Sequence, residues 1–252
     1  MERHRSFFAG SALALVLLTG PAAAGADAGE RILRLMDAQL TSADNQYFEY
    51  EMTTRTPGRG QRSTVFEVTI QGDQRRRLEF LAPGDVKGMR VLILSLDRMY
   101  VYLPAYRKVR RVASHVRDQG FMGSAFSHDD MSVVTYADKL SGRLLAEDDE
   151  HWTVEAVRRA DSDYRYAKLR LVIRRDIRHP ARIEYFNAAG QKVKTETRSA
   201  YECRGQHCNP KRMTLVDHTR GGVTSVLERR AWKIEPEVPA NFFSVRSLQR
   251  RR

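Results

Sequence analysis

The chain has 252 residues, and its 43 Lys and Arg against 31 Asp and Glu give a formal net charge of +12 at pH 7. This length suits a single domain with a substantial core, or alternatively two domains. Beyond residue 24 no apolar run approaches membrane-spanning length, which excludes an integral protein with several membrane helices.

The first 24 residues have the three parts of a cleavable secretory signal: a positive start, an apolar stretch from Phe7 to Leu18 and an alanine-rich exit. The apolar stretch is too short to span a bilayer. Cleavage after Ala24 or after Ala26 would follow small residues, as signal-peptide cleavage sites do. No Cys to which a lipid anchor could be attached follows directly after the apolar stretch. We therefore predict a periplasmic protein, soluble after signal cleavage, in which residues 25–252 form one domain. An uncleaved N-terminal anchor is the alternative.

The strong positive charge by itself would indicate a nucleic-acid partner. The predicted export argues against nucleic acid and offers other polyanions, the headgroups of phospholipid and lipopolysaccharide. An arginine-rich solvated surface explains the same charge, so both interpretations stay open.

Residues 27–40 predict an amphipathic helix. The residues on its apolar face are Ile32, Leu33, Leu35, Met36 and Leu40. Asp27, with Glu30 three positions later, has the pattern of a capping box at the start of this helix. An apolar face of this kind needs a partner to cover it.

From Tyr47 onward the hydrophobic period changes to two, as in Thr64–Ile70, and Gly72-Asp73 forms a turn into Arg77–Leu81. Further strand-like segments cover residues 90–96, 99–103, 107–112, 151–157, 168–174, 182–186, 192–200, 212–216 and 224–232. Short turns between neighbours favour antiparallel pairing. The sequence thus predicts a mainly β fold, a single large curved antiparallel sheet that curls into a full or partial barrel, with the helix on its concave side.

The period breaks down between Val112 and Leu140, where glycines and aspartates punctuate the chain. This stretch still holds the apolar residues Phe121, Met122, Phe126 and Met131. An irregular segment with such residues suits a flap over the mouth of a cavity. A loop docked onto the core is the alternative.

The chain has two cysteines, Cys203 and Cys208, with four residues between them. In an oxidising compartment a disulfide across a loop is expected, contributing only about 2 kcal/mol because the loop is short. A metal site that also uses His207 is the alternative.

No segment of the sequence matches a known catalytic motif closely. Ser124 lacks the second glycine of a nucleophile elbow, and His128-Asp129-Asp130 fits a solvated turn as well as a cation site. No phosphate loop or metal-protease motif is present. The sequence therefore favours binding over catalysis, with no cofactor and no resident metal.

Several motifs together resemble the outer-membrane lipoprotein-sorting family, the LolA-like superfamily of periplasmic lipoprotein carriers. They are Phe80-Leu81-x-Pro83-x-Asp85-Val86-Lys87-Gly88, Tyr100-x-Tyr102-Leu103-Pro104, the basic run Arg107 to Arg111, Phe121-Met122-Gly123-Ser124-x-Phe126-Ser127, Pro180 to Phe186, and Phe243-Ser244 before Leu248. The resemblance covers essentially the whole chain after the signal.

This resemblance implies an unclosed β-barrel with a helical lid, whose apolar cavity shields acyl chains during transport to the outer membrane. The implied partners are a lipid or acylated lipoprotein cargo, an inner-membrane exporter, an outer-membrane acceptor and a transiently contacted membrane surface. Exposing acyl chains to water costs about 0.8 kcal/mol per methylene, so a carrier needs an apolar cavity rather than a reactive group. The alternatives are an envelope-stress or lipid sensor of the same fold that regulates a membrane partner, and an enzyme acting on lipid.

We assign candidate residues on this basis. The cavity wall is expected to contain Phe66, Val68, Leu78, Phe80, Tyr100 and Tyr102, the lid Leu33 and Met36, and the flap Phe121, Met122, Phe126 and Met131. Lys108, Arg110 and Arg111 are expected to contact headgroups or the membrane surface. Alternation alone leaves open which face of each strand is concave.

Overall fold

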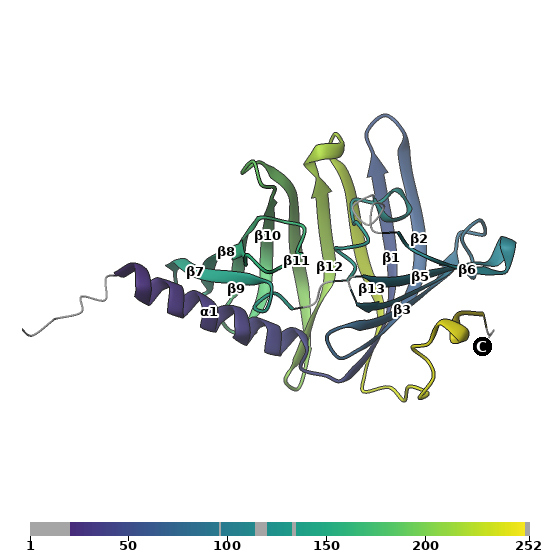
Figure 1. The fold of residues 1–252 in the computed structure, drawn as a ribbon, viewed down its shortest axis with the longest axis horizontal. Coiled ribbons are helices and arrows are strands. Elements are labelled where there is room, and N and C mark those ends of the chain that lie inside the picture. Colours follow the sequence, from purple (N-terminus) through teal and green to yellow (C-terminus); the bar gives the residue numbers. More distant parts are fainter. Residues whose placement is uncertain (1–20, 96, 114–119, 133–134, 250–252) are drawn as a thin grey trace, which may run out of the picture.

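The computed structural model describes residues 21–95, 97–113, 120–132 and 135–249, and residues 1–20 of the predicted signal lie outside them. The described residues form one antiparallel sheet of thirteen strands, not closed into a barrel, with a single long helix at the N-terminal end (Figure 1). Within this part of the chain no helix has the length and apolarity needed to cross a bilayer. The predicted mainly β fold with an unclosed sheet is confirmed.

The elements follow one another in a simple order. They are α1 (Pro21–Leu40), β1 (Asn45–Thr56), β2 (Gly60–Gln71), β3 (Arg75–Ala82), β4 (Arg90–Ser95), β5 (Arg98–Leu103), β6 (Lys108–Arg111), β7 (Leu140–Glu147), β8 (His151–Arg158), β9 (Lys168–Arg174), β10 (His179–Phe186), β11 (Lys192–Arg204), β12 (His207–Asp217) and β13 (Val223–Ile234). Short 3-10 turns lie between or after the strands, among them Pro104–Tyr106 and Val245–Gln249.

The first and last strands pair in the middle of the sheet. The spatial order is β6-β5-β4-β3-β2-β1-β13-β12-β11-β10-β9-β8-β7, so the two edge strands, β6 and β7, are consecutive in the chain. The segment between them therefore has to pass from one edge of the sheet to the other. Its described parts, residues 120–132 and 135–139, are called the flap below.

The sheet has two distinct faces because side chains alternate along each strand. Directly opposed residues of antiparallel strands lie on the same face, and Phe66 is opposed to both Tyr50 and Phe80. These residues belong to one buried cluster with Leu33 and Met36 of α1 and Phe121 of the flap. We call the face that packs against α1 and the flap the inner face, and the other the outer face.

Helix α1 is longer than predicted and begins at Pro21 instead of residue 27. Proline suits a first helical turn, and the alanines that follow are strong helix formers. Asp27 therefore lies within the helix, and the predicted capping box is wrong. Glu30 instead bonds to the sheet, accepting hydrogen bonds from Ser141 Oγ at 2.8 Å and from an Arg159 nitrogen at 2.9 Å.

The helix packs mainly on edge strand β7, with further contacts to β8 and β10 (Figure 1). The backbones of α1 and β7 come close together because each has a glycine at the contact, Gly29 in α1 and Gly142 in β7. A Cβ on Gly29 would lie 2.5 Å from the Arg143 nitrogen, and one on Gly142 would lie 2.8 Å from the Gly29 oxygen. Strand β7 was not predicted, since its Leu-Ser-Gly-Arg-Leu-Leu sequence does not alternate cleanly.

The C-terminal segment covers part of the outer face. After β13 the chain runs back across β3 and β4, where the Phe242 ring lies 4.4 Å from the Arg77 guanidinium carbon. Arg90 donates to the carbonyl oxygen of Leu248 at 2.9 Å, and the Leu248 side chain is fully buried. The outer face of this half of the sheet is therefore partly packed as well.

The predicted disulfide is confirmed. Cys203 and Cys208 are opposed at the tip of the β11–β12 hairpin, with Cα atoms 4.1 Å apart. The bond decides against a metal site that would use both thiolates. The same tip contacts the region after α1, where Ser42 Oγ lies 2.9 Å from His207 Nδ1, so the hairpin helps to hold the helix in place.

Replacing Gly142 tests the contact between helix and edge strand. Gly142→Ala should lower the free energy of unfolding by about 1–3 kcal/mol, because the new methyl group would meet Leu33 Cδ1 and the Gly29 oxygen within 2.8 Å. Urea unfolding followed by circular dichroism gives the value. Gly84→Ala is the matched control, since no heavy atom lies within 4 Å of a Cβ there. Equal stability of the two variants would contradict the close packing.

Candidate functional site

A continuous row of aromatic rings crosses the inner face. In spatial order the rings belong to Trp232, Phe48, Tyr50, Phe66, Phe80 and Phe121, and neighbouring ring centroids are 5.6–6.3 Å apart. The row follows from register, because cross-strand pairing opposes Phe48 to Trp232 and Tyr50 to Phe66. Rings at these separations attract one another beyond the burial of their surface. The result is a broad apolar wall that spans β13, β1, β2 and β3.

Several predicted site residues lie on this wall or beside it. Phe66, Val68, Leu78 and Phe80 occupy inner positions of β2 and β3, and Leu33 and Met36 reach the same cluster from α1. All six are at most 6% exposed. The structure therefore brings them together, and their contact with an acyl chain stays a prediction.

Tyr100 and Tyr102 lie elsewhere, which corrects their predicted place on the wall. Their opposed residues on β4 are Leu92 and Arg90, whereas Val91 and Ile93 are the β4 residues that join the inner cluster. Both tyrosines are therefore on the outer face. Strand β5 reads Met-Tyr-Val-Tyr-Leu after its first residue, with apolar or aromatic residues at every position, so alternation could not decide the face.

The flap fills the space in front of the wall. Phe121 is 4% exposed with its ring centroid 5.7 Å from that of Phe80, and Phe126 is 6% exposed. Met122 and Met131 are partly buried against the same cluster. The structure shows the second of the two predicted interpretations, a segment docked onto the core, and its role as a flap over a cavity stays a prediction. With Phe66 and Phe80 at most 1% exposed, the wall is closed to solvent.

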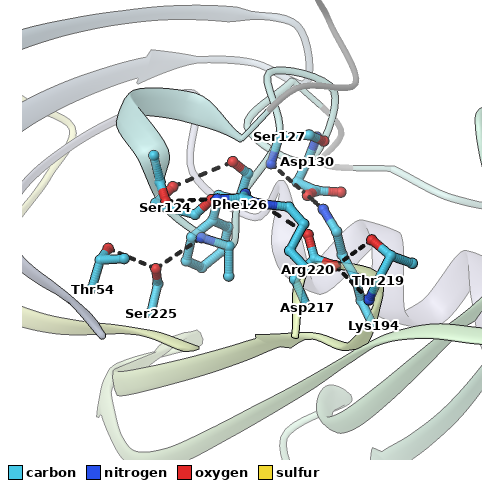
Figure 2. A network of polar contacts seen from close by, with 12 residues as sticks. Thr54, Ser124, Phe126, Ser127, Asp130, Lys194, Asp217, Thr219, Arg220 and Ser225 are labelled. Atoms are coloured by element: carbon cyan, nitrogen blue, oxygen red, sulfur yellow. Dashed lines mark hydrogen bonds and ion pairs between the residues drawn. The ribbon is translucent and has the colours of Figure 1, made fainter. Parts of the chain in front are cut away.

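Hydrogen bonds from sheet side chains hold the backbone of the flap (Figure 2). The Ala125 nitrogen donates to Ser225 Oγ at 2.9 Å. Arg220 donates to the carbonyl oxygens of Ser124 at 2.5 Å and Gly123 at 2.9 Å. These bonds come from the start of β13 and the turn before it, and they fix one end of the flap.

A buried ion pair holds the middle of the flap. Asp130 pairs with Lys194 of β11, and the two side chains are 7% and 5% exposed. The same carboxylate accepts hydrogen bonds from Tyr166 Oη and from the Ser127 nitrogen, both at 2.7 Å. Figure 2 shows Lys194 reaching from the sheet toward Asp130. A charge pair this deeply buried depends on each partner for its stability.

A second buried cation contacts the flap from β3. Arg76 is 5% exposed and donates a hydrogen bond to the carbonyl oxygen of Met131. Burial lowers its pKa from 12.5 to about 10, so the guanidinium is charged at neutral pH. The inner face is therefore apolar along the aromatic row and cationic on both sides of it.

Helix α1 holds the last part of the flap. Asp37 Oδ2 accepts hydrogen bonds from the Tyr136 nitrogen at 2.8 Å and the Ala137 nitrogen at 2.7 Å. Burial raises the pKa of this carboxyl from 3.8 to about 6, although the two hydrogen bonds act in the opposite direction. The contact between α1 and the flap is thus sensitive to protonation near pH 6.

The predicted basic residues lie on edge strand β6. Lys108 and Arg110 have exposed side chains, and Arg111 donates to the Asp97 carbonyl oxygen at 2.9 Å. The turn before them carries Tyr106, which is 71% exposed. An exposed aromatic residue beside exposed cations forms a rim at one edge of the sheet, which we call the basic edge.

Sequence reasoning missed Asp37, Lys194, Arg220 and Arg76. The helical pattern placed Asp37 on the polar face of α1, although it contacts the flap. One usable signal was present in β11, where Lys192, Lys194, Glu196 and Arg198 put charges at every second position and so predict one charged face. Nothing in the sequence indicated that this face points inward.

Comparison with known proteins agrees with this architecture. A family model described as "Uncharacterized protein" matches residues 72–250. The chain belongs to this family. No curated protein matches it in sequence.

Solved structures share the fold. A DUF1329 family protein from Desulfovibrio piger is 21% identical, with a TM-score of 0.82 over 89% of this chain and 99% of the other. A domain described as a putative outer membrane lipoprotein-sorting protein, from Vibrio parahaemolyticus, is 21% identical with a TM-score of 0.80, over 89% and 100%. A LolA superfamily protein from Nitrosomonas europaea is 18% identical with a TM-score of 0.72, over 87% and 98%. The predicted LolA-like resemblance is confirmed for the fold.

The protonation of Asp37 gives a pH-dependent prediction. A carboxyl whose pKa is raised in the folded state stabilises the fold below pH 4, and this contribution is lost as pH rises through 6. Asp37→Asn keeps an acceptor for both backbone hydrogen bonds without the charge. Its stability relative to the natural chain should therefore increase by about 2 kcal/mol between pH 4 and pH 7.

Urea unfolding at several pH values measures this difference. Asp149→Asn, on an exposed turn, is the control and should show no such trend. A difference between Asp37→Asn and the natural chain that stays constant from pH 4 to pH 7 would show that Asp37 does not titrate in this range.

Proposed function

We propose that the protein is a periplasmic carrier that binds the acyl chains of a lipid or lipoprotein on its aromatic inner face when the flap withdraws. One observation carries this proposal: a continuous wall of buried rings is covered by a segment of the chain whose own Phe121 and Phe126 fill the space. The LolA-like fold supports the same conclusion.

The exchange of flap for cargo is energetically reasonable. The flap is held by single hydrogen bonds to its backbone, such as those at Ala125 and Tyr136, each contributing about 1 kcal/mol net. The buried Asp130–Lys194 pair and the packing of Phe121 and Phe126 hold it as well. An acyl chain that replaces Phe121 and Phe126 recovers about 0.8 kcal/mol per buried methylene. The cargo can therefore cover the apolar surface that the flap exposes on withdrawal, which allows reversible loading.

The predicted secretory signal and the similarity in fold to the putative outer membrane lipoprotein-sorting domain from Vibrio parahaemolyticus support a position between two membranes. We extend the proposal to an exporter that loads the carrier at the inner membrane and an acceptor at the outer membrane. The basic edge, with Lys108, Arg110, Arg111 and Tyr106, is the surface we assign to transient membrane contact. Cations attract anionic headgroups and an exposed tyrosine suits the headgroup region.

Native mass spectrometry with lipid extraction, on protein taken gently from the periplasm of its own host, tests the carrier function directly. A co-purifying lipid or lipoprotein is the expected result. A stable protein partner without lipid would favour the sensor alternative, and an empty protein that binds no acyl compound would overturn the proposal.

Truncating the flap should make binding easier. Phe121→Ala removes a ring from the closed state, where large aromatic truncations cost about 3–5 kcal/mol. A less stable closed state leaves more protein competent to bind, so affinity for an apolar fluorescent probe should rise at least about fivefold. Tyr102→Ala, on the outer face, is the control and should leave probe affinity unchanged. Equal affinities for both variants would mean that the flap does not compete with the ligand.

Membrane contact can be tested with vesicles. Replacing Lys108 and Arg110 together by Gln should weaken binding to anionic vesicles by about thirtyfold, since each cation near such a surface contributes about 1 kcal/mol. Arg182→Gln with Arg170→Gln removes two comparably exposed cations near the other end of the sheet and should have little effect. Vesicle sedimentation at low and high salt provides the measurement. Equal losses in the two double variants would assign the effect to net charge alone.

A further inference from the structure

We propose that the cargo carries an anionic headgroup, which replaces the Asp130 carboxylate on Lys194 and Tyr166 when the flap withdraws. This inference rests on the proposed carrier function and specifies its substrate class as anionic amphiphiles.

The Asp130 carboxylate occupies a built anion site. Lys194 and Tyr166 are 4% and 2% exposed, and both direct polar atoms at this carboxylate, Tyr166 through a hydrogen bond of 2.7 Å. Neither residue belongs to the flap. Lys194 is in β11, opposed to Tyr185 and Asp217 on the inner face. The ammonium and hydroxyl groups therefore stay in place when Asp130 leaves.

The other carboxylates near Lys194 are engaged with different partners. Asp217 accepts hydrogen bonds from the Thr219 nitrogen at 3.0 Å and hydroxyl at 2.6 Å, and lies 3.9 Å from Arg220. Figure 2 shows this group beside Lys194.

Glu196, two positions further along β11, is likewise occupied. Its carboxylate pairs with Arg198 at 2.6 Å and accepts from Tyr185 Oη at 2.7 Å. Withdrawal of Asp130 would therefore leave a buried ammonium group without its counter-ion, which is strongly unfavourable.

Two more cations lose acceptors at the same time. Arg220 is bonded to the Ser124 and Gly123 carbonyl oxygens, and Arg76 to the Met131 carbonyl oxygen. The space vacated by the flap thus combines an aromatic wall with three cations that have lost their flap acceptors, while Asp37 of α1 loses its two flap donors at the far end. A phosphate or carboxylate on the cargo satisfies this charge, whereas a neutral headgroup does not.

The flap itself has the chemistry of such a cargo. Phe126 buries an apolar ring on the inner face, and four positions later Asp130 provides an anion to Lys194. An amphiphile with apolar chains and an anionic head would make both sets of contacts. The flap therefore acts as an internal substitute that satisfies the inner face while no cargo is bound.

Matched lipids test this inference on the full processed chain. Short-chain phosphatidylglycerol, phosphatidylcholine and diacylglycerol with the same tail-labelled acyl chains differ only in the headgroup, and fluorescence titration gives the dissociation constant of each. Phosphatidylglycerol should bind at least about tenfold more tightly than diacylglycerol, as expected for a charge-assisted contact in a buried site, and phosphatidylcholine, whose phosphate is offset by its own choline cation, should lie between them. Glycerol phosphate without acyl chains should displace it only at concentrations at least about a hundredfold higher, because it buries no methylenes.

Four variants separate the role of the charge from that of the fold. Lys194→Gln should abolish the preference for phosphatidylglycerol over diacylglycerol, although it also loosens the closed flap by leaving Asp130 unpaired, and Lys194→Arg should retain the preference. Lys192→Gln, an exposed cation on the same strand, is the matched control. Asp130→Asn leaves Lys194 in place and weakens its competitor, so it should increase phosphatidylglycerol affinity more than diacylglycerol affinity. This variant keeps the test valid if Lys194→Gln does not fold.

The outcomes distinguish this inference from the carrier function. Equal binding of all three lipids, or an Asp130→Asn change that is equal for all of them, overturns the headgroup inference and leaves the carrier function standing. Displacement by glycerol phosphate at the concentration of the lipid itself would assign the site to a free anion and also overturn it. If none of the lipids binds, the carrier function fails and this inference fails with it.

Discussion

The pairing of the first strand with the last is the constraint on which the rest of the structure depends. Because β1 and β13 lie together in the middle of the sheet, the strands run outward in chain order from β1 and in reverse chain order from β13, and β6 and β7 become the edges. The chain between these edges has to cross the whole width of the sheet. Residues 120–132 of this connection lie over the inner face, which brings Phe121 and Phe126 onto the aromatic row.

The inner face joins two chemically different halves. Around β1 to β3 it is aromatic, while β11 contributes Lys194, Glu196 and Arg198 at alternate positions. Buried charges of this kind are tolerated only when each has a partner. A segment that covers such a face needs apolar and acidic side chains at a matching spacing, and the flap supplies both through Phe126 and Asp130. The composition of the flap is therefore a consequence of the face it covers.

Much of the architecture could be predicted from local patterns, with errors that have specific physical causes. Strands with one apolar and one polar face, such as Thr64–Ile70, were recognised because alternation marks them unambiguously. Strand β5 is apolar on both faces, since the C-terminal segment covers part of the outer face, and Tyr100 and Tyr102 were therefore assigned to the wrong side. Strand β7 is packed against α1 through Gly142 and lacks a clean alternation, so it was missed.

The sequence by itself determined most of the strands, the turns, the disulfide between Cys203 and Cys208 and the apolar content of the flap, because these depend on neighbours a few positions apart. Only the tertiary structure decided which face of the sheet is inward and which charges meet there. Asp130 and Lys194 are separated by 64 positions, and Asp37 and Tyr136 by 99. Such contacts depend on the register of many strands at once. A local sequence pattern therefore cannot identify a partner that comes close only after the whole sheet has formed.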